Sequence, residues 1–264
     1  MDLKLKDKIV FVSGSTAGIG FAIARRFLQE GARVIINGRT NEGVEKAINE
    51  LKSAVKDANI SGIAADFAKV EDVNNLLKTL PEVDILINNA GIFEPKPFAE
   101  IPDEDWFRFF EVNVMSGIRL SRHYFPKMLA KNWGRIIFIS SESAVFIPDE
   151  MIHYGMTKTA QIAVSRGLAE LTQGTNVTVN SILPGPTKSK GVNVFLEDLS
   201  KADNKSVSEV EEDFFKNMRP TSLLQRFASV EEIADTTVYF CSPLASATNG
   251  ASIRVEGGLI RSIL

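Results

Sequence analysis

VFVSGSTAGIG, residues 10–20, runs from a short apolar segment into a turn that holds three glycines. The apolar segment predicts a buried strand, and the residues after Gly18 follow a helical period. Glycines let the backbone turn tightly and approach a ligand, because no Cβ stands in the way. The free N–H groups at the start of the helix, together with its dipole, favour an anion. The stretch therefore predicts a strand–turn–helix unit that can hold a pyrophosphate, although glycines also serve plain turns.

The rest of the chain repeats this alternation of short aliphatic strands and helical segments. The predicted strands are residues 9–13, 33–37, 61–65, 84–88, 134–140, 177–183 and 252–255. The predicted helices are residues 19–29, 43–56, 70–79, a long helix within 102–130, 152–172 and 230–240. Such alternation is typical of a parallel sheet covered on both faces. We expect a single α/β domain over residues 1–264, a Rossmann-type doubly wound parallel sheet of about seven strands flanked by helices.

Composition and charge narrow the class of protein. The chain has 264 residues, of which 44% are hydrophobic and 24% charged, as in an ordinary globular protein. A net charge of −3 gives no electrostatic reason to expect a nucleic acid. Two histidines and the single Cys241 suggest neither a metal cluster nor an intramolecular disulfide. Without an apolar run of ~18 residues or a secretory signal, we expect a cytoplasmic protein with no membrane partner.

One segment departs from the alternation. Residues 188–220 are long and acidic, and they also carry several phenylalanines and leucines. This pattern predicts one or two amphipathic helices inserted over the sheet as a substrate lid. A solvated excursion with a small core of its own is the alternative.

The end of the second predicted strand bears on the choice of a dinucleotide. An NAD site usually has an acidic residue there, which bonds the ribose 2′-hydroxyl. Here Gly38 takes that place and Arg39 follows it. A guanidinium suits a 2′-phosphate through forked, charge-assisted hydrogen bonds. The sequence favours NADP(H) over NAD(H), unless Arg39 is simply a solvated loop charge.

Tyr154 and Lys158 lie four residues apart on a predicted helix, and Ser141 lies thirteen residues before the tyrosine. Residues at this spacing share a helix face. An unperturbed phenol has a pKa of ~10, and a neighbouring ammonium favours phenolate and lowers that pKa. Such pairs also occur on ordinary helices, so the glycine turn and Ser141 are what favour a proton donor. Ser140 competes with Ser141, but its spacing to Tyr154 is less suitable.

Several motifs occur in a fixed order along the chain. They are Ser13-Gly14-x-x-x-Gly18-Ile19-Gly20, Asp66, Asn88-Asn89-Ala90-Gly91, Asn113, Ser141, Tyr154-x-x-x-Lys158 and Pro184-Gly185. From about Leu5 to Gly258 the chain resembles the short-chain dehydrogenase/reductase (SDR) family, and most closely its 3-oxoacyl-carrier-protein reductase-like branch. The resemblance implies hydride transfer between a nicotinamide cofactor and a carbonyl or secondary alcohol. Two other functions stay open: a non-catalytic NADP(H)-binding regulator, and an epimerase or dehydratase, whose chains are usually longer.

The resemblance also implies a role for each matching residue. Tyr154 would give or take the proton, and Lys158 would lower its pKa and bind the nicotinamide ribose. Ser141 would orient the substrate oxygen, and Asn113 would hold a relay water. The residues expected to bind the cofactor are Gly14, Ser15, Thr16, Gly18, Ile19, Gly20, Arg39, Asp66, Phe67, Asn88, Ala90, Gly91, Tyr154, Lys158, Pro184, Gly185, Thr187 and Ser189. The Asn88–Gly91 motif can equally be a turn that ties adjacent strands together.

The expected substrate pocket mixes apolar and polar residues. Its candidate residues are Phe93, Ser143, Met151 and Phe195, with Glu94, Pro148, Pro186 and Val192 beside them. They include no arginine cluster, so we expect a neutral, partly hydrophobic small molecule, although half of these residues could merely pack the lid. Glu142 departs from the family pattern, and on an extended chain it would face away from Ser141.

The helix predicted at residues 152–172 carries apolar groups on several sides. A helix of this kind is buried on more than one side. The resemblance implies that the second side meets another subunit. We therefore expect a homo-oligomer, a tetramer or a dimer.

Overall fold

Seven parallel strands form one sheet in the part of the chain that the structure describes, in the order β3-β2-β1-β4-β5-β6-β7. The structure is a computed structural model that describes residues 1–263, with the backbone alone for Phe195, Ala202 and Asp203. The strands are β1 (Ile9–Val12), β2 (Arg33–Gly38), β3 (Ile60–Ala64), β4 (Ile85–Asn88), β5 (Gly134–Ile139), β6 (Val177–Pro184) and β7 (Ser252–Val255). Every predicted strand is confirmed, and each end differs from its prediction by at most one residue.

The strand order reverses between β1 and β4, which are neighbours in the sheet. In a doubly wound sheet, ligands bind beyond the carboxyl ends of the strands at such a reversal. The topology therefore puts the glycine turn that follows β1 beside the Asn88–Gly91 turn that follows β4.

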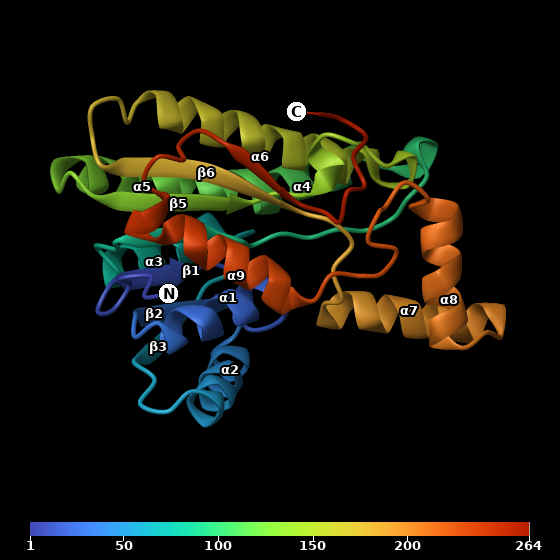
Figure 1. The fold of residues 1–264 in the computed structure, drawn as a ribbon, viewed down its shortest axis with the longest axis horizontal. Helices are drawn as coiled ribbons and strands as arrows, with labels where there is room; N and C mark the ends of the chain where they lie inside the picture. The colour runs from blue at the N-terminus through green and yellow to red at the C-terminus, as the bar shows by residue number, and fades with distance from the viewer. Residues whose placement is uncertain (264) are drawn as a thin grey trace.

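Helices cover both faces of the sheet (Figure 1). The main helical segments are α1 (Gly18–Gln29), α2 (Asn41–Ala54), α3 (Val70–Thr79), α4 (Asp103–Phe109), the π-helical η2 (Phe110–Met115), α5 (Ser116–Ala130), α6 (Ile152–Glu170), α7 (Lys190–Asp203), α8 (Val207–Asp213), the π-helical η5 (Phe214–Met218) and α9 (Val230–Cys241). Short 3₁₀ turns are η1 (Phe98–Glu100), η3 (Glu142–Ala144), η4 (Asp149–Met151) and η6 (Pro243–Ala245). The predicted long helix within 102–130 is thus three consecutive pieces, with a π-helical stretch in the middle.

Alternation along β1 divides the core into two layers. Val10 and Val12 point into a cluster with α1, α2 and α9, whereas Phe11 points into a second cluster with α3, α5 and α6. Successive side chains of a strand face opposite sides of the sheet, so one strand serves both layers. Both clusters are fully apolar, which fixes the register of the sheet against the helices.

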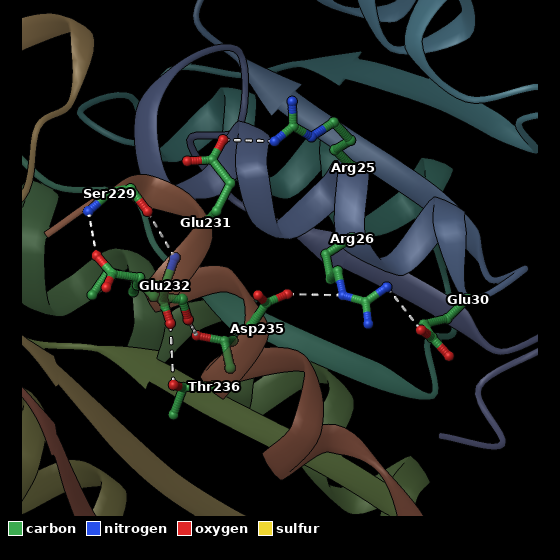
Figure 2. A network of polar contacts seen from close by, with 10 residues as sticks. Arg25, Arg26, Glu30, Ser229, Glu231, Glu232, Asp235 and Thr236 are labelled. Atoms are coloured by element: carbon green, nitrogen blue, oxygen red, sulfur yellow. Dashed lines mark hydrogen bonds and ion pairs between the residues drawn. The ribbon is translucent and has the colours of Figure 1, made fainter. Parts of the chain in front are cut away.

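Polar contacts join α1 to α9 at the surface (Figure 2). Arg25 pairs with Glu231 at 2.6 Å and Arg26 with Asp235 at 2.9 Å. All four side chains are partly or largely exposed, and exposed pairs contribute only about 0–1 kcal/mol each. The apolar faces of the two helices, not these pairs, hold α9 in place.

The segment 188–220 folds into α7, α8 and η5, which stand apart from the two helix layers (Figure 1). Leu196, Val210, Phe215 and Phe227 form a small core there. The predicted amphipathic helices are therefore present, and so is the small core of the alternative. Within residues 1–263, no helix is both long and apolar enough to cross a membrane.

Candidate active site

A cavity of about 380 Å³ opens beyond the carboxyl ends of the central strands. It is bounded by the start of α1, the turns after β4, β5 and β6, the start of α6, and the segment 188–220. The predicted residues that line it are Ile19, Phe93, Ser141, Ser143, Met151, Tyr154, Pro184, Gly185, Pro186, Thr187, Ser189 and Val192. Residues expected for catalysis, cofactor and substrate therefore share one cavity.

Ser141 lies two residues after the end of β5 and caps the η3 turn. Its hydroxyl accepts a hydrogen bond from the N–H of Ser143 at 3.1 Å and donates one to Glu142 at 2.5 Å. Ser140 also borders the cavity, but its hydroxyl donates to the main-chain carbonyl of Lys158 at 2.8 Å. That bond ties β5 to α6. The geometry therefore favours Ser141 over Ser140 as the group that meets a substrate.

Tyr154 and Lys158 lie on the first turns of α6. The Lys158 Nζ atom is 5.5 Å from the centroid of the Tyr154 ring and donates to the carbonyl of Ile139 at 2.9 Å. Burial lowers the pKa of Lys158 to about 8, partly offset by the Glu142 carboxylate. Burial raises the pKa of Tyr154, and the Glu142 carboxylate raises it further. The sequence led us to expect a lowered pKa for the Tyr154 phenol. The protein by itself shifts this pKa in the opposite direction.

Asn113 is fully buried in the π-helical stretch η2. Its side chain accepts from the N–H of Ile92 at 2.7 Å and donates to Thr157 at 3.0 Å. Its main-chain carbonyl accepts from the amide of Gln161. The same amide accepts from the Lys158 ammonium at 3.3 Å. Gln161 thus links Asn113 to Lys158, a role that the sequence analysis missed although Gln161 is one helical turn beyond the lysine.

Glu142 does not face away from Ser141, so that expectation was wrong. The chain turns into η3 directly after Ser141, which brings the Glu142 carboxylate back to accept from the Ser141 hydroxyl. The side chain is only 7% exposed and borders the cavity. Burial raises its pKa, partly offset by the bond from Ser141 and by the charge of Arg219.

Arg219 is a second residue that the sequence analysis missed. It follows η5, is buried, and pairs with Glu150 of η4 at 3.0 Å. Both side chains border the cavity. The pair joins the segment 188–220 to the turn before α6. The available signal was an arginine at the end of a segment that carries Phe214, Phe215 and Met218.

The glycine turn has the shape expected of an anion site. Gly14 and Gly18 have positive φ angles of 59° and 60°. A Cβ on Gly20 would lie 2.4 Å from Asn89 Nδ2. Asn89 donates to the carbonyl of Gly14 at 2.8 Å, so the turn after β4 ties the two strands together, as the alternative interpretation of this motif predicted. Ala17 gives α1 no side-chain cap, which leaves the first N–H groups of the helix for a ligand.

Three residues expected at the cofactor have their side chains committed elsewhere. Ser15 donates its hydroxyl to Val12 and its N–H to Asn37. Phe67 is buried in the core, and Asn88 donates to Ser121 of α5 at 3.1 Å. Each of these side chains faces the protein interior, so a contact of these residues with the cofactor, which stays a prediction, would have to come from the main chain.

Other expected cofactor residues border the same edge. Asp66 accepts from the N–H of Ala68 at 3.1 Å, and a Cβ on Gly91 would lie 3.5 Å from Lys158 Nζ. Ala90, which is part of the Asn88–Gly91 motif, lies against Gly14. The Thr187 hydroxyl donates to the carbonyl of Gly185 at 2.8 Å, and the Thr187 carbonyl accepts from the N–H of Ser189 at 2.8 Å.

The end of β2 leaves no room for an acidic side chain. A Cβ on Gly38 would lie 2.5 Å from Thr16 Cγ2. Arg39 is exposed directly after it, and no ion pair to Arg39 occurs within residues 1–263. Ser189 caps α7 by accepting from the N–H of Val192 at 3.3 Å.

Two pocket candidates do not border the cavity. Glu94 pairs with Arg108 of α4 at 2.9 Å, which turns it outward, and Pro148 is buried behind the η4 turn. The side chain of Phe195 lies outside the described part of the chain.

Comparison with known proteins agrees with this geometry. The family profile for short chain dehydrogenase matches residues 8–199. The uncharacterized oxidoreductase YvaG of Bacillus subtilis (strain 168) is 51% identical over 100% of both chains. The 3-oxoacyl-[acyl-carrier-protein] reductase FabG of Aquifex aeolicus (strain VF5) is 31% identical over 98% of this chain and 100% of its own. The solved L-sorbose reductase of Gluconobacter frateurii, complexed with NADPH and L-sorbose, has a TM-score of 0.93 at 30% identity over 100% of both chains. The chain belongs to the short-chain dehydrogenase/reductase family and is an oxidoreductase.

Proposed function

We propose that this protein uses NADP(H) to interconvert a carbonyl and a secondary alcohol on a neutral small molecule. One observation carries the proposal: Ser141 and Tyr154 border the same cavity as Ile19 of the uncapped α1 start and Thr187 of the turn after β6. A bound nicotinamide would supply the hydride to the substrate carbon or accept it from there.

The chain's own residues handle the proton. Tyr154 gives it to the substrate oxygen in reduction and takes it in oxidation. The raised pKa of Tyr154 keeps the phenol protonated, which suits reduction. Lys158, with a pKa of about 8, is largely an ammonium at neutral pH and favours the phenolate left after transfer. Ser141 holds the substrate oxygen, and Gln161 and Asn113 form the polar path behind Lys158.

Two features support NADP(H) over NAD(H). Arg39 is exposed and unpaired within residues 1–263 at the end of β2, and Gly38 has no space for the acidic residue that reads a 2′-hydroxyl. The sorbose reductase that shares this fold was solved with NADPH.

The segment 188–220 acts as a substrate lid in this proposal. Phe214, Met218 and Arg219 border the cavity from that segment, and Arg219 fastens it to Glu150. Phe107, on α4, is 74% exposed, and Phe110, three residues later, is 39% exposed. An apolar surface of this kind supports a homo-oligomer, which gel filtration with light scattering would test.

The test of the function is the loss of nicotinamide absorbance with a panel of ketones, aldehydes, quinones and 3-oxoacyl thioesters. Each is run with NADPH and with NADH, beside Tyr154→Phe. We expect turnover with NADPH that falls at least ~100-fold in the variant, because general acid catalysis is lost. Tight NADPH binding without turnover of any compound would contradict the proposal and favour the regulator.

A further inference from the structure

Glu142 is a buried carboxylate without a cation of its own. No ion pair to Glu142 occurs within residues 1–263. The charge of Arg219 lowers the pKa of Glu142, but Arg219 is already paired with Glu150 at 3.0 Å. Ser141, the residue proposed to hold the substrate oxygen, donates to the Glu142 carboxylate, and Ser143 donates to it through its N–H and its side chain. A buried carboxylate is costly unless donors satisfy it.

The bond between Ser141 and Glu142 creates a conflict for substrates that carry no donor. A serine hydroxyl has one proton, and here Glu142 accepts it. If Ser141 turns its proton to a substrate carbonyl, the Glu142 carboxylate loses the bond from Ser141 and keeps only those from Ser143. A substrate hydroxyl beside the carbonyl removes this conflict, because it donates to Glu142 and releases the Ser141 proton for the carbonyl oxygen.

We propose that Glu142 determines substrate specificity by accepting a hydrogen bond from a hydroxyl on the carbon next to the reacting carbonyl. The preferred substrate is then a neutral α-hydroxy ketone, or a vicinal diol in the oxidative direction. This inference rests on the proposed function and names its substrate class.

Geometry supports a neighbouring hydroxyl. The Ser141 Oγ and Glu142 carboxylate oxygens are 2.5 Å apart. The two oxygens of an α-hydroxy ketone can lie at about the spacing of two hydrogen-bonded oxygens, so one can meet Ser141 while the other meets Glu142. A hydroxyl further along the molecule would have to bend back to reach the same carboxylate.

The charges of the cavity favour a neutral partner. Glu150 neutralises Arg219, so an anionic substrate would meet Glu142 without a compensating cation. Burial raises the pKa of Glu142, because a buried carboxylate is disfavoured unless donors satisfy it. A substrate hydroxyl supplies such a donor without adding a charge to the cavity.

Apolar side chains also line the cavity and can receive an apolar group. Phe93, Met151, Val192 and Phe214 border it. The Phe93 ring lies edge-on to the Tyr154 ring, with centroids 6.4 Å apart. The rest of the substrate is therefore hydrophobic. An aryl or alkyl α-hydroxy ketone suits both the Ser141 and Glu142 pair and the apolar lining.

The test compares two ketones of equal size, 2-hydroxyacetophenone and propiophenone, which differ by a hydroxyl in place of a methyl. With NADPH, we expect the wild-type kcat/KM for the hydroxy ketone to exceed that for propiophenone by about 10- to 100-fold, the value of a hydrogen bond to a buried charged group. Glu142→Leu should reduce this ratio to about one, because it replaces the acceptor with an apolar side chain of similar volume.

Controls separate this role from folding and from overall charge. NADPH binding by Glu142→Leu, followed by fluorescence titration, shows that the variant is folded. If it does not fold, Glu142→Gln, which keeps shape and an uncharged acceptor, should show an intermediate ratio. Asp149→Asn removes one negative charge from an exposed position on the same loop and should leave the ratio unchanged.

Four results would overturn the inference. Equal wild-type efficiency on the two ketones would refute it and leave the proposed function intact. An unchanged ratio in Glu142→Leu would refute the role of Glu142. A preference for 2-aminoacetophenone over both ketones would refute the hydroxyl assignment. No turnover of either ketone by the NADPH-bound wild type would refute the inference, and the proposed function falls with it only if the whole panel of carbonyl compounds is inactive as well.

Discussion

Arg39 gives the sharpest test of the cofactor assignment. It is exposed at the end of β2, and no ion pair within residues 1–263 engages it. A hydrogen bond between charged groups is worth about 1.5–3 kcal/mol, and an exposed side chain keeps the smaller part of that. Arg39→Ala should therefore weaken NADPH binding by about 10-fold and leave NADH binding within about twofold.

The assay is a fluorescence titration of each cofactor at low salt and at 0.15 M salt. The loss for NADPH should shrink at the higher salt, because ions screen an exposed charge pair. Arg33→Ala is the matched control, since Arg33 is exposed at the opposite end of the same strand. An equal loss for NADPH and NADH, or no loss for NADPH, would refute the assignment of Arg39 to the 2′-phosphate.

Three further predictions follow from the site and its support. Lys158 has a folded pKa of about 8 against an ordinary value of 10.5, so the unfolded chain binds more protons between these pH values and the wild type gains stability as pH rises through them. At pH 7 the free energy of unfolding of Lys158→Met should therefore exceed that of the wild type by at most about 3 kcal/mol. In urea titrations this difference should shrink towards pH 10.5, and a difference that stays constant with pH would contradict the prediction. Arg219→Met should raise KM by about 10-fold, because it removes the ion pair that fastens the lid to Glu150. Lys188→Met breaks an exposed ion pair within the lid and should leave KM unchanged. Equal effects of the two substitutions in steady-state kinetics would argue against the fastening role of Arg219. Gly185→Ala would place a Cβ 2.6 Å from the main chain of Glu256, so we expect it to lower the free energy of unfolding by about 1–3 kcal/mol, measured as a lower Tm. Gly191→Ala, whose Cβ would be 4.0 Å from its nearest neighbour, should leave Tm nearly unchanged. Similar Tm values for both variants would show that the main chain at the strand ends shifts to make room.

The sheet could be predicted from the sequence because its signals are local. Each strand is a short aliphatic run bounded by polar residues or glycine, and Gly14 and Gly18 stand where the backbone needs a positive φ. Buried parallel strands leave little freedom in where such runs begin and end. The same holds for the cluster of Ser141, Tyr154 and Lys158, whose spacing on a strand end and a helix brings them together.

What could not be predicted depends on contacts between distant parts of the chain. The side chain of Glu142 turns back because Ser141 caps a 3₁₀ turn, a choice that an extended strand pattern does not reveal. The pKa of Tyr154 rises because of burial first and the Glu142 carboxylate second, and both depend on how the whole cavity is assembled. Arg219 and Glu150 are distant in sequence and meet only through the lid.

The π-helical stretch η2 has a consequence for how the chain tolerates changes in length. An α-helix turns about 100° per residue, and a π-helical stretch inserts one extra residue into that progression. Asn113 in η2 is anchored to Ile92, while Leu120 and Tyr124 of α5 are anchored in the core. Deleting a single residue between 110 and 115 would regularise the helix and rotate one anchor away from its partner. The extra residue of η2 thus sets how far Asn113 is rotated about the helix axis relative to Leu120 and Tyr124. We therefore expect the loss of one residue there to reduce folding stability more than most single substitutions do.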